Sequence, residues 1–133
     1  MGDRVLATGY FARAKEYADR GFSIVSISLK RPWWLMAKVE LNEFIPLNPT
    51  IDMIDLAHEG RYEEYEERYR SEILSRLNPH EVVKDLHALY GRKVALLCFE
   101  AAGKFCHRHI VAKWIEENTG ISVDELEVKK SGK

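Results

Sequence analysis

Cysteine, histidine, arginine and glutamate side chains gather in one short stretch of the carboxyl-terminal third of the chain. Cys98 and Glu100 are followed, after a short interval, by Cys106, His107 and Arg108. A thiol at the start of a helix beside a cation ionises more readily than a free one, and a guanidinium matches the geometry of phosphate or carboxylate. These residues predict an anion site in which Arg108 binds the ligand, Cys106 is the nucleophile, and His107 or Glu100 transfers a proton.

Each of these residues also has an ordinary structural explanation. Free cysteine is often buried as a small apolar residue, which is the commoner role for Cys98. His107 falls on the apolar face of the helix expected here, where a histidine is more often an interior hydrogen-bonding group than a catalyst. His109 is expected in solvent, and Glu100 could simply accept N–H groups from the loop. The role of Cys106 therefore stays open between packing and chemistry, and so does the question of whether the chain is an enzyme.

A metal site is the less favoured alternative. Its ligands would be Cys98, Cys106, His107 and His109, but the two cysteines are farther apart than the short spacings of zinc sites. The two histidines also point to opposite sides of the expected helix. We therefore predict no bound metal and no cofactor.

Two regular elements must position this site. Residues 94–99 form an unbroken apolar run, which predicts a strand covered on both faces and therefore a parallel, central one. Residues 106–118 predict a helix with one apolar face, ended by Gly120. Ligands in open α/β sheets bind beyond the carboxyl ends of the strands, and the amino end of a helix favours anions there.

The amino-terminal part predicts further strands of the same sheet. Residues 4–8 indicate a strand broken by Gly9, residues 10–20 a helix, and residues 22–29 a second strand, which together make a right-handed βαβ unit. If these strands run parallel to residues 94–99, their carboxyl ends share one edge. Ligand-binding groups from separate parts of the chain would gather at that edge near Glu100, namely Thr8, Tyr10, Ser28, Lys30 and Arg31.

The loop Lys30-Arg31-Pro32-Trp33-Trp34 combines cations with aromatic rings. Such a loop can hold a nucleotide or stack the bases of a single strand, with Trp33 as a stacking platform. The commoner alternative is that both tryptophans pack beneath the loop while the cations remain in solvent. A nucleic-acid-binding module without catalysis is therefore the alternative function.

The middle of the chain predicts mainly helices. Residues 36–41 suggest an additional strand, residues 48–58 a helix capped by Asn48, and residues 78–90 a helix capped by Asn78. Residues 61–77 predict the clearest helix, whose tyrosine stripe would serve the core or a contact between subunits of a homo-oligomer. Residues 121–128 are ambiguous between a short helix capped by Ser122 and an edge strand at 126–128.

Length, charge and cysteine content bound the class of protein. With 133 residues and a net charge of −1, the chain has no bulk attraction for nucleic acid or membrane, and its length suits one domain over residues 1–133 with a frayed tail at 129–133. Two cysteines without a disulfide-dense pattern fit a reducing compartment, and no stretch reads as a signal peptide or a membrane span. We expect a cytoplasmic protein with a single three-layer α/β domain, whose small, mostly parallel sheet is flanked by helices.

The stretch Leu-Leu-Cys-Phe-Glu ending at Glu100, followed by Phe-Cys-His-Arg-His ending at His109, resembles the family called Domain of Unknown Function 488 in its short bacterial and phage form. Residues 8–12, Ser-Ile-Ser at 26–28 with the loop after it, and the tyrosine-rich segment 62–69 resemble it too, so the resemblance reaches to about Glu117. The resemblance implies a compact α/β domain and no established reaction. It marks a set of positions without agreed roles: Cys98, Glu100, Cys106, His107 and Arg108.

Overall fold

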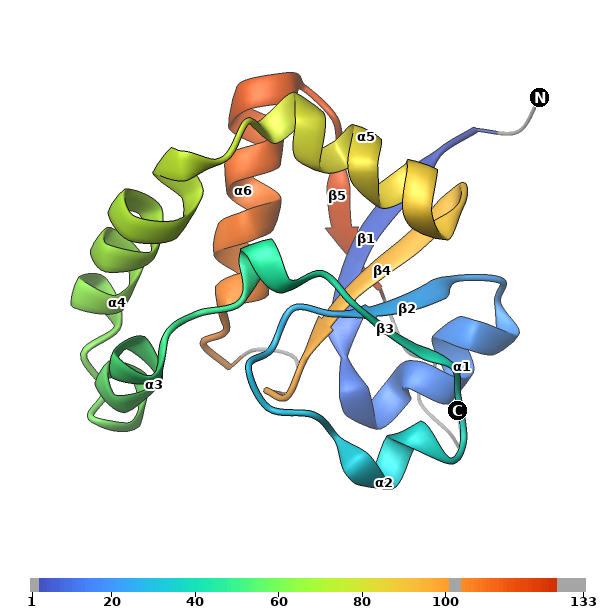
Figure 1. Ribbon diagram of the computed structural model, residues 1–133, viewed down its shortest axis with the longest axis horizontal. Coiled ribbons are helices and arrows are strands. Elements are labelled where there is room, and N and C mark those ends of the chain that lie inside the picture. Colours follow the sequence, from blue (N-terminus) through green and yellow to red (C-terminus); the bar gives the residue numbers. More distant parts are fainter. Residues whose placement is uncertain (1–2, 101–103, 127–133) are drawn as a thin grey trace, which may run out of the picture.

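The computed structural model describes residues 3–100 and 104–126, which form a five-stranded sheet in the order β3-β2-β4-β1-β5 (Figure 1). Every pairing between neighbouring strands is parallel. The α/β class and the parallel sheet predicted from the sequence are therefore confirmed, while the expected tail at 129–133 lies outside the described residues. The strands are β1 (Val5–Tyr10), β2 (Ser23–Ser26), β3 (Leu41–Glu43), β4 (Lys93–Cys98) and β5 (Val123–Glu125).

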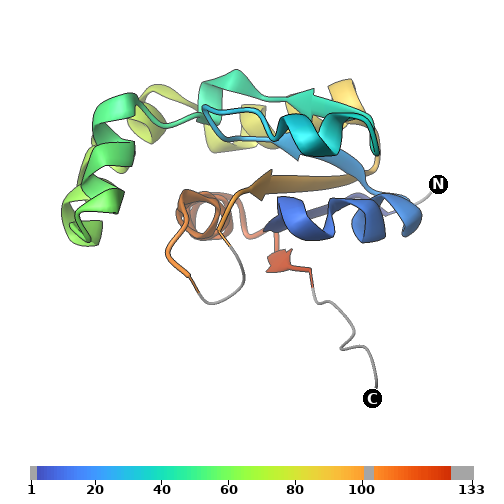
Figure 2. The same cartoon turned by 90° about the horizontal axis from the view of Figure 1, so that it is seen from below.

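Helices connect these strands and cover the sheet. The α-helices are α1 (Ala14–Asp19), α2 (Trp33–Met36), α3 (Ile51–His58), α4 (Tyr62–Arg68), α5 (Pro79–Tyr90) and α6 (His107–Thr119). Short 3₁₀ segments span Phe11–Arg13, Ile45–Leu47 and Leu74–Arg76, and α4 continues as a π-helical turn over Tyr69–Ile73. Figure 2 shows α1 and α5 on opposite sides of β4, with α3 and α4 together at one end of the molecule.

The unbroken apolar run predicted as a central strand is β4, which pairs with β1 on one side and β2 on the other. Ala95 and Leu97 belong to a core formed with α1 and α2, whereas Val94 and Leu96 belong to a larger core formed with α3 to α6. All four residues are fully buried. The absence of alternation in the sequence thus reflects burial on both faces of the sheet.

Helix ends follow the local chemistry, with one correction. Asn78 caps α5 by accepting a hydrogen bond from the backbone N–H of Glu81 at 3.1 Å, and Gly120 ends α6 in the left-handed conformation with φ of 75°, as predicted. The prediction that Asn48 caps the next helix is wrong. Thr50 is the cap of α3, because its hydroxyl accepts from the backbone N–H of Met53 at 3.3 Å.

We had predicted that Gly9 breaks the first strand. This prediction is wrong, because Gly9 lies inside β1. A β-carbon at this position would lie 2.5 Å from the Tyr17 ring. The Tyr17 hydroxyl accepts a hydrogen bond from the backbone N–H of Tyr10 at 3.4 Å, and burial raises the pKa of Tyr17 to about 12. The glycine is therefore explained by the close approach of α1 to the strand and not by a turn.

Further strand boundaries differ from the sequence prediction, including that of β2, which ends at Ser26 and not at residue 29. The additional strand expected at residues 36–41 begins only at Leu41, because α2 and a turn occupy the preceding residues. In the ambiguous segment 121–128, the described residues form an edge strand at Val123–Glu125 rather than a helix capped by Ser122, and residues 127–128 of the other expected strand lie outside them. The backbone N–H of Val123 donates to the carboxylate of Glu116 at 2.8 Å, which ties this strand to α6.

The tyrosine stripe of residues 61–77 lies partly in the core. Tyr65 and Tyr69 are buried, and the Tyr69 hydroxyl donates to the backbone carbonyl of Leu47 at 2.6 Å. Tyr62 is exposed and stacks on Phe105 with ring centroids 4.4 Å apart. The prediction of a homo-oligomer stays a prediction.

Among the described residues, no helix is long and apolar enough to cross a membrane.

Candidate functional site

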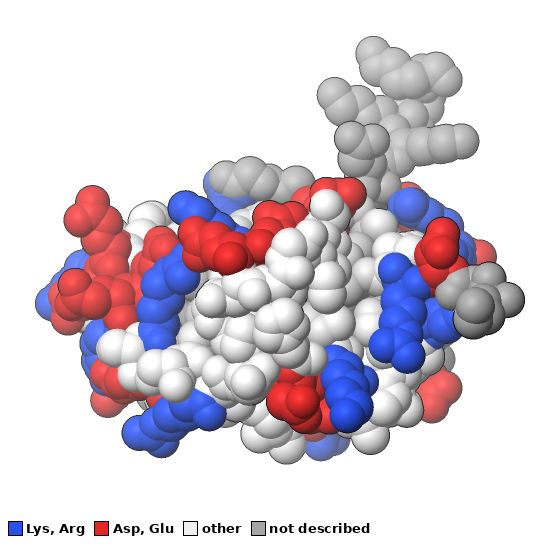
Figure 3. Space-filling view, turned by 90° about the horizontal axis from the view of Figure 1, so that it is seen from above, with Lys and Arg blue, Asp and Glu red and all other residues white. Residues whose placement is uncertain are grey.

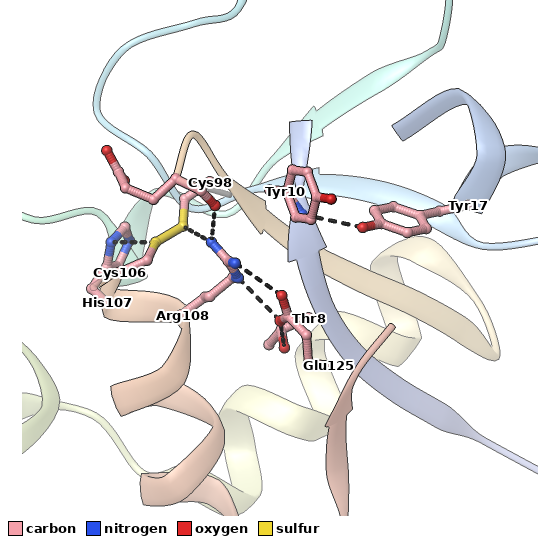
Figure 4. Close-up of polar contacts among 9 residues, drawn as sticks. Thr8, Tyr10, Tyr17, Cys98, Cys106, His107, Arg108 and Glu125 are labelled. Atoms are coloured by element: carbon pink, nitrogen blue, oxygen red, sulfur yellow. Dashed lines mark hydrogen bonds and ion pairs between the residues drawn. A yellow bond between two sulfur atoms is a disulfide. The ribbon is translucent and has the colours of Figure 1, made fainter. Parts of the chain in front are cut away.

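The junction between β4 and α6 brings the two cysteines together. Cys98 is the last residue of β4, and Cys106 precedes the first turn of α6. Their sulfur atoms form a disulfide (Figure 4). Cysteines in the reducing compartment that we expected would be free thiols, but the fold brings these two within bonding distance. Cys106 is thus positioned at the amino end of a helix, as predicted, but its sulfur is paired.

His107 is a buried, neutral histidine on the apolar face of α6. Its Nε2 lies 2.6 Å from the carbonyl oxygen of Ile27, which makes Nε2 the protonated nitrogen. Its Nδ1 then carries a lone pair and lies 3.9 Å from the Cys106 sulfur. Burial lowers the pKa of His107 to about 4, with the charge of Arg108 adding to the effect. The ring can therefore accept a hydrogen bond from a Cys106 thiol but does not carry a positive charge at neutral pH.

Arg108 is completely buried, and its guanidinium is held by internal partners. Its Nε and Nη2 donate to the two carboxylate oxygens of Glu125 at 3.1 and 2.8 Å. Its Nη1 donates to the Cys98 sulfur at 3.1 Å and to the backbone carbonyl of Glu100 at 2.7 Å. Figure 4 shows the guanidinium between the disulfide and Glu125. Arg108 therefore links β4, β5 and α6 from inside the protein.

Glu125 completes this ion pair and was not among the residues singled out from the sequence. Partial burial alone would raise the pKa of Glu125, but hydrogen bonds from Arg108 and Thr8 and the charge of Arg108 outweigh it, so the pKa lies below its usual value. The Thr8 hydroxyl donates to the same carboxylate at 2.6 Å. No local motif marks Glu125, because its partner lies on another element and the segment itself was ambiguous.

Three of the predicted ligand-binding residues lie around this ion pair: Arg108 and Thr8 both donate to Glu125, and Tyr10 lies near Arg108. The guanidinium carbon of Arg108 lies 5.8 Å from the centroid of the Tyr10 ring. None of the three lines the pocket described below. With its fork occupied by a protein carboxylate, Arg108 does not have the arrangement we predicted for an arginine that binds an external anion.

A pocket of about 330 Å³ lies at the carboxyl edge of the sheet, beside α3 and α4. Predicted site residues from three separate segments line it, namely Ser28, Lys30, Glu100, Cys106 and His107. Aromatic side chains complete its wall, among them Tyr62, Phe99 and Phe105. These five residues therefore meet at one strand edge, as the sequence predicted, and the pocket is within the size range of small-ligand sites.

The remaining predicted residues, Arg31 and Trp33, lie in the loop before and the first turn of α2. Arg31 forms an ion pair with Glu43 at 2.8 Å. The expectation that both tryptophans pack beneath the loop is wrong for Trp33, which is 79% exposed. Trp34 is also exposed, at 39%. An exposed aromatic ring beside basic residues is compatible with the alternative function, in which this loop contacts nucleic acid.

Cys98, Cys106 and His107 are also the groups that could hold a metal ion, since their ligand atoms lie within 4.8 Å of one another. The spacing of the two cysteines in the sequence disfavoured a metal site, but the fold brings their sulfur atoms together despite that spacing. The exposed His109 is not part of the cluster. Only the reduced form of the protein has thiolates to offer a metal, so this capacity depends on the state of the disulfide.

Surface charge gives no simple indication of a partner. In the face shown in Figure 3, basic side chains are interspersed with acidic ones around a broad uncharged area. The paired charges include Arg70 with Glu66 and Arg68 with Glu72. This face has no continuous basic surface of the kind that binds a phosphate backbone.

Comparison with known proteins adds the family. No curated protein and no solved structure matches the chain. One family model matches residues 35–119, which is more than half of the chain and includes α3 to α5, β4, both cysteines and α6. The model describes the active DUF488-N3 subclade. The chain therefore belongs to the DUF488-N3a family, within the Domain of Unknown Function 488 group that the residues around Cys98 and Cys106 resemble.

Proposed function

We propose that the chain binds a small anion, of the nucleotide or phosphorylated-metabolite class, in the pocket at the β4–α6 junction, and that Cys106 is the reactive group beside it. The observation that carries this proposal is that Lys30, Cys106 and His107 line one pocket of about 330 Å³. Its size suits a ligand no larger than a mononucleotide.

The electrostatic support comes from Lys30 and from the amino end of α6. Lys30 supplies an exposed cation in the pocket wall, and the first backbone N–H groups of a long helix attract negative charge. Arg108 is not the anion-binding group in this proposal, because Glu125 holds its guanidinium. Aromatic side chains such as Phe99 and Tyr62 offer a surface for a flat ring.

Once the Cys98–Cys106 disulfide is reduced, Cys106 would act as a thiol rather than as a preformed thiolate. With the pKa of His107 at about 4, the imidazole accepts a hydrogen bond from the thiol without taking its proton in the resting state. A reaction at Cys106 would then transfer the proton to His107 Nδ1 as the new bond to sulfur forms. Glu100, at the rim of the pocket, is the second candidate for moving a proton.

Ligand titration tests the anion site. Nucleoside monophosphates and inorganic phosphate are titrated into the protein and followed by NMR at two salt concentrations. Lys30→Met should weaken binding about fivefold, the effect of one cation at contact distance in a hydrated site. Lys84→Met, which removes an exposed lysine from α5, is the matched control. Absence of binding at millimolar ligand, or equal effects of both substitutions, would refute the proposal.

A second test concerns Cys106. In the Cys98→Ser variant, Cys106 is the remaining cysteine, and its alkylation rate is measured by mass spectrometry with and without the bound anion. A ligand in the pocket should slow alkylation, because it covers the sulfur. An unchanged rate at saturating ligand would separate the anion site from Cys106.

The second candidate function is contact with single-stranded nucleic acid through the α2 loop, favoured by the exposure of Trp33. Stacking of a base on Trp33 should quench tryptophan fluorescence, most strongly at low salt. Trp33→Ala should abolish this quenching. A full response in Trp33→Ala would contradict a role for this ring.

A further inference from the structure

The two sulfur atoms of the disulfide lie in different surroundings. Cys106 lines the pocket, and its sulfur faces Nδ1 of His107. Cys98 is fully buried, does not line the pocket, and accepts a hydrogen bond from Arg108 Nη1 at 3.1 Å. One sulfur is therefore reachable from the pocket, and the other is enclosed beside a cation. Figure 4 shows the Cys106 sulfur beside His107 and the Cys98 sulfur beside Arg108.

We propose that the Cys98–Cys106 disulfide is redox-active and exchanges with low-molecular-weight thiols that enter the pocket, with Cys106 as the attacked sulfur and Cys98 as the leaving thiolate. This inference rests on the proposed function, since it uses the same pocket. It adds a class of substrate, namely small thiols that carry carboxylates, because Lys30 lies in the pocket wall.

The exchange balances in two steps. A substrate thiolate attacks the Cys106 sulfur, a new sulfur–sulfur bond forms, and the electron pair of the broken bond leaves on Cys98. A second substrate thiolate then attacks the substrate sulfur of this mixed disulfide and releases the Cys106 sulfur. Two substrate thiols are oxidised to one substrate disulfide, the protein gains two thiol groups, and the protons come from the two substrate thiols.

Arg108 is placed to favour this direction of cleavage. Glu125 engages its Nε and Nη2, which orients Nη1 toward the Cys98 sulfur. A hydrogen bond from a guanidinium is stronger to a thiolate than to a sulfur in a disulfide, so it stabilises the leaving group. Arg108 is thus a positioning residue that makes the reduced form more favourable.

His107 makes the two released thiols unequal. Its Nε2 donates to the Ile27 carbonyl, so only its Nδ1 lone pair faces Cys106. A neutral ring in this orientation accepts a hydrogen bond from a Cys106 thiol and does not stabilise a thiolate. Of the two thiols that reduction releases, Cys98 is therefore expected to ionise more readily than Cys106.

Single-cysteine variants test which sulfur reacts. Cys98→Ser and Cys106→Ser are each incubated with glutathione disulfide, and the mixed disulfide is measured by mass spectrometry after acid quenching. Cys98→Ser, which retains Cys106, should react about tenfold faster than Cys106→Ser. The Cys98 that remains in Cys106→Ser is buried and reacts only after local opening of the structure. The difference should vanish in urea. Equal rates in the folded proteins would overturn the assignment of Cys106 as the attacked sulfur.

Reduction of the wild-type disulfide tests the activity itself. The oxidised protein is incubated with glutathione, which is anionic, and with 2-mercaptoethanol, which is neutral. Both should reduce the folded protein. Resistance to both thiols until the protein is unfolded would overturn the inference even if phosphate or nucleotide binds. Reduction by both thiols, with no effect of Lys30→Met and no anion binding, would leave the exchange standing and remove the proposed anion site.

Arg108→Lys tests the leaving group. Loss of a charged hydrogen bond to the thiolate should shift the equilibrium with glutathione about tenfold toward the protein disulfide. A folded variant, verified by its NMR spectrum, with an unchanged equilibrium would contradict this role of Arg108. If the variant does not fold, the single-cysteine comparison still decides the site of attack.

Discussion

Glu125→Gln is the substitution that best tests how the β4–α6 junction is held. The glutamine keeps the size of the side chain and one carbonyl oxygen but removes the negative charge. Arg108 would then remain completely buried with no carboxylate against its Nε and Nη2. The cost of the substitution is mainly the cost of an uncompensated buried cation.

The expected loss of stability follows from the burial of the pair. Removing one partner of a fully buried ion pair costs about 3–5 kcal/mol. The Arg108 side chain is 0% exposed but the Glu125 side chain is 27% exposed, so water can reach the site. We therefore expect about 3 kcal/mol, the lower end of that range. For a domain of this size such a loss lowers the melting temperature by about 10 °C.

The pH dependence provides an internal check. The pKa of Glu125 is lower in the folded protein than in the unfolded chain, so its contribution to stability is present above the unfolded value of about 4.5. That contribution is lost as the pH falls through the lower pKa of the folded state. The difference between wild type and Glu125→Gln should therefore be constant at neutral pH and shrink in acid.

Urea unfolding followed by tryptophan fluorescence at neutral and acidic pH measures both quantities. Glu117→Gln is the matched control on α6, because the Glu117 side chain is 49% exposed and pairs with Arg70 at the longer distance of 3.6 Å. That control should change stability by less than about 0.5 kcal/mol. A loss below about 1 kcal/mol for Glu125→Gln would show that water or another group compensates Arg108, and would refute the reasoning.

Three further predictions concern other parts of the structure. The His107 ring should titrate near pH 4 in an NMR experiment. Because the pKa of histidine in the unfolded chain is about 6.5, the free energy of unfolding should fall as the pH drops from about 6.5 toward 4. A titration midpoint near pH 6.5 would exclude a buried neutral ring. Tyr69→Phe should cost about 1–2 kcal/mol in urea unfolding, because the buried Leu47 carbonyl loses its donor, and an unchanged stability would contradict this hydrogen bond. Gly9→Ala should cost about 1–3 kcal/mol in the same assay, because the added methyl group meets the buried Tyr17 ring, whereas a neutral result would mean that α1 shifts freely.

Much of the fold around the site follows from local patterns. Residues 94–99 had to be covered on both faces because they do not alternate, and the structure places Lys93–Cys98 at the centre of the sheet. Asn78 and Gly120 mark helix ends through their own chemistry. These features depend on neighbours in sequence, which is why they could be predicted.

Strand boundaries were less predictable where tertiary packing decided them. A glycine is typical of the end of a strand, but Gly9 lies inside β1. A glycine is required there because the Tyr17 ring occupies the space of a β-carbon. The sequence left open whether Trp33 packs beneath its loop or lies in solvent as a stacking platform, and the structure leaves it 79% exposed in the short helix α2. Neither outcome depends on the residue's sequence neighbours alone.

The sequence by itself determined which side chains could take part in chemistry and which edge of the sheet they would reach. Parallel strands end at one edge, so Lys30, Glu100 and Cys106 meet at a pocket although they are distant in the chain. Only the tertiary structure decided how these groups are partnered. The direction of Arg108, held by Glu125 from the edge strand, and the pairing of Cys98 with Cys106 depend on contacts between separate elements. Such contacts follow from the packing of the whole domain, because no local spacing specifies which carboxylate or which thiol will face a given side chain.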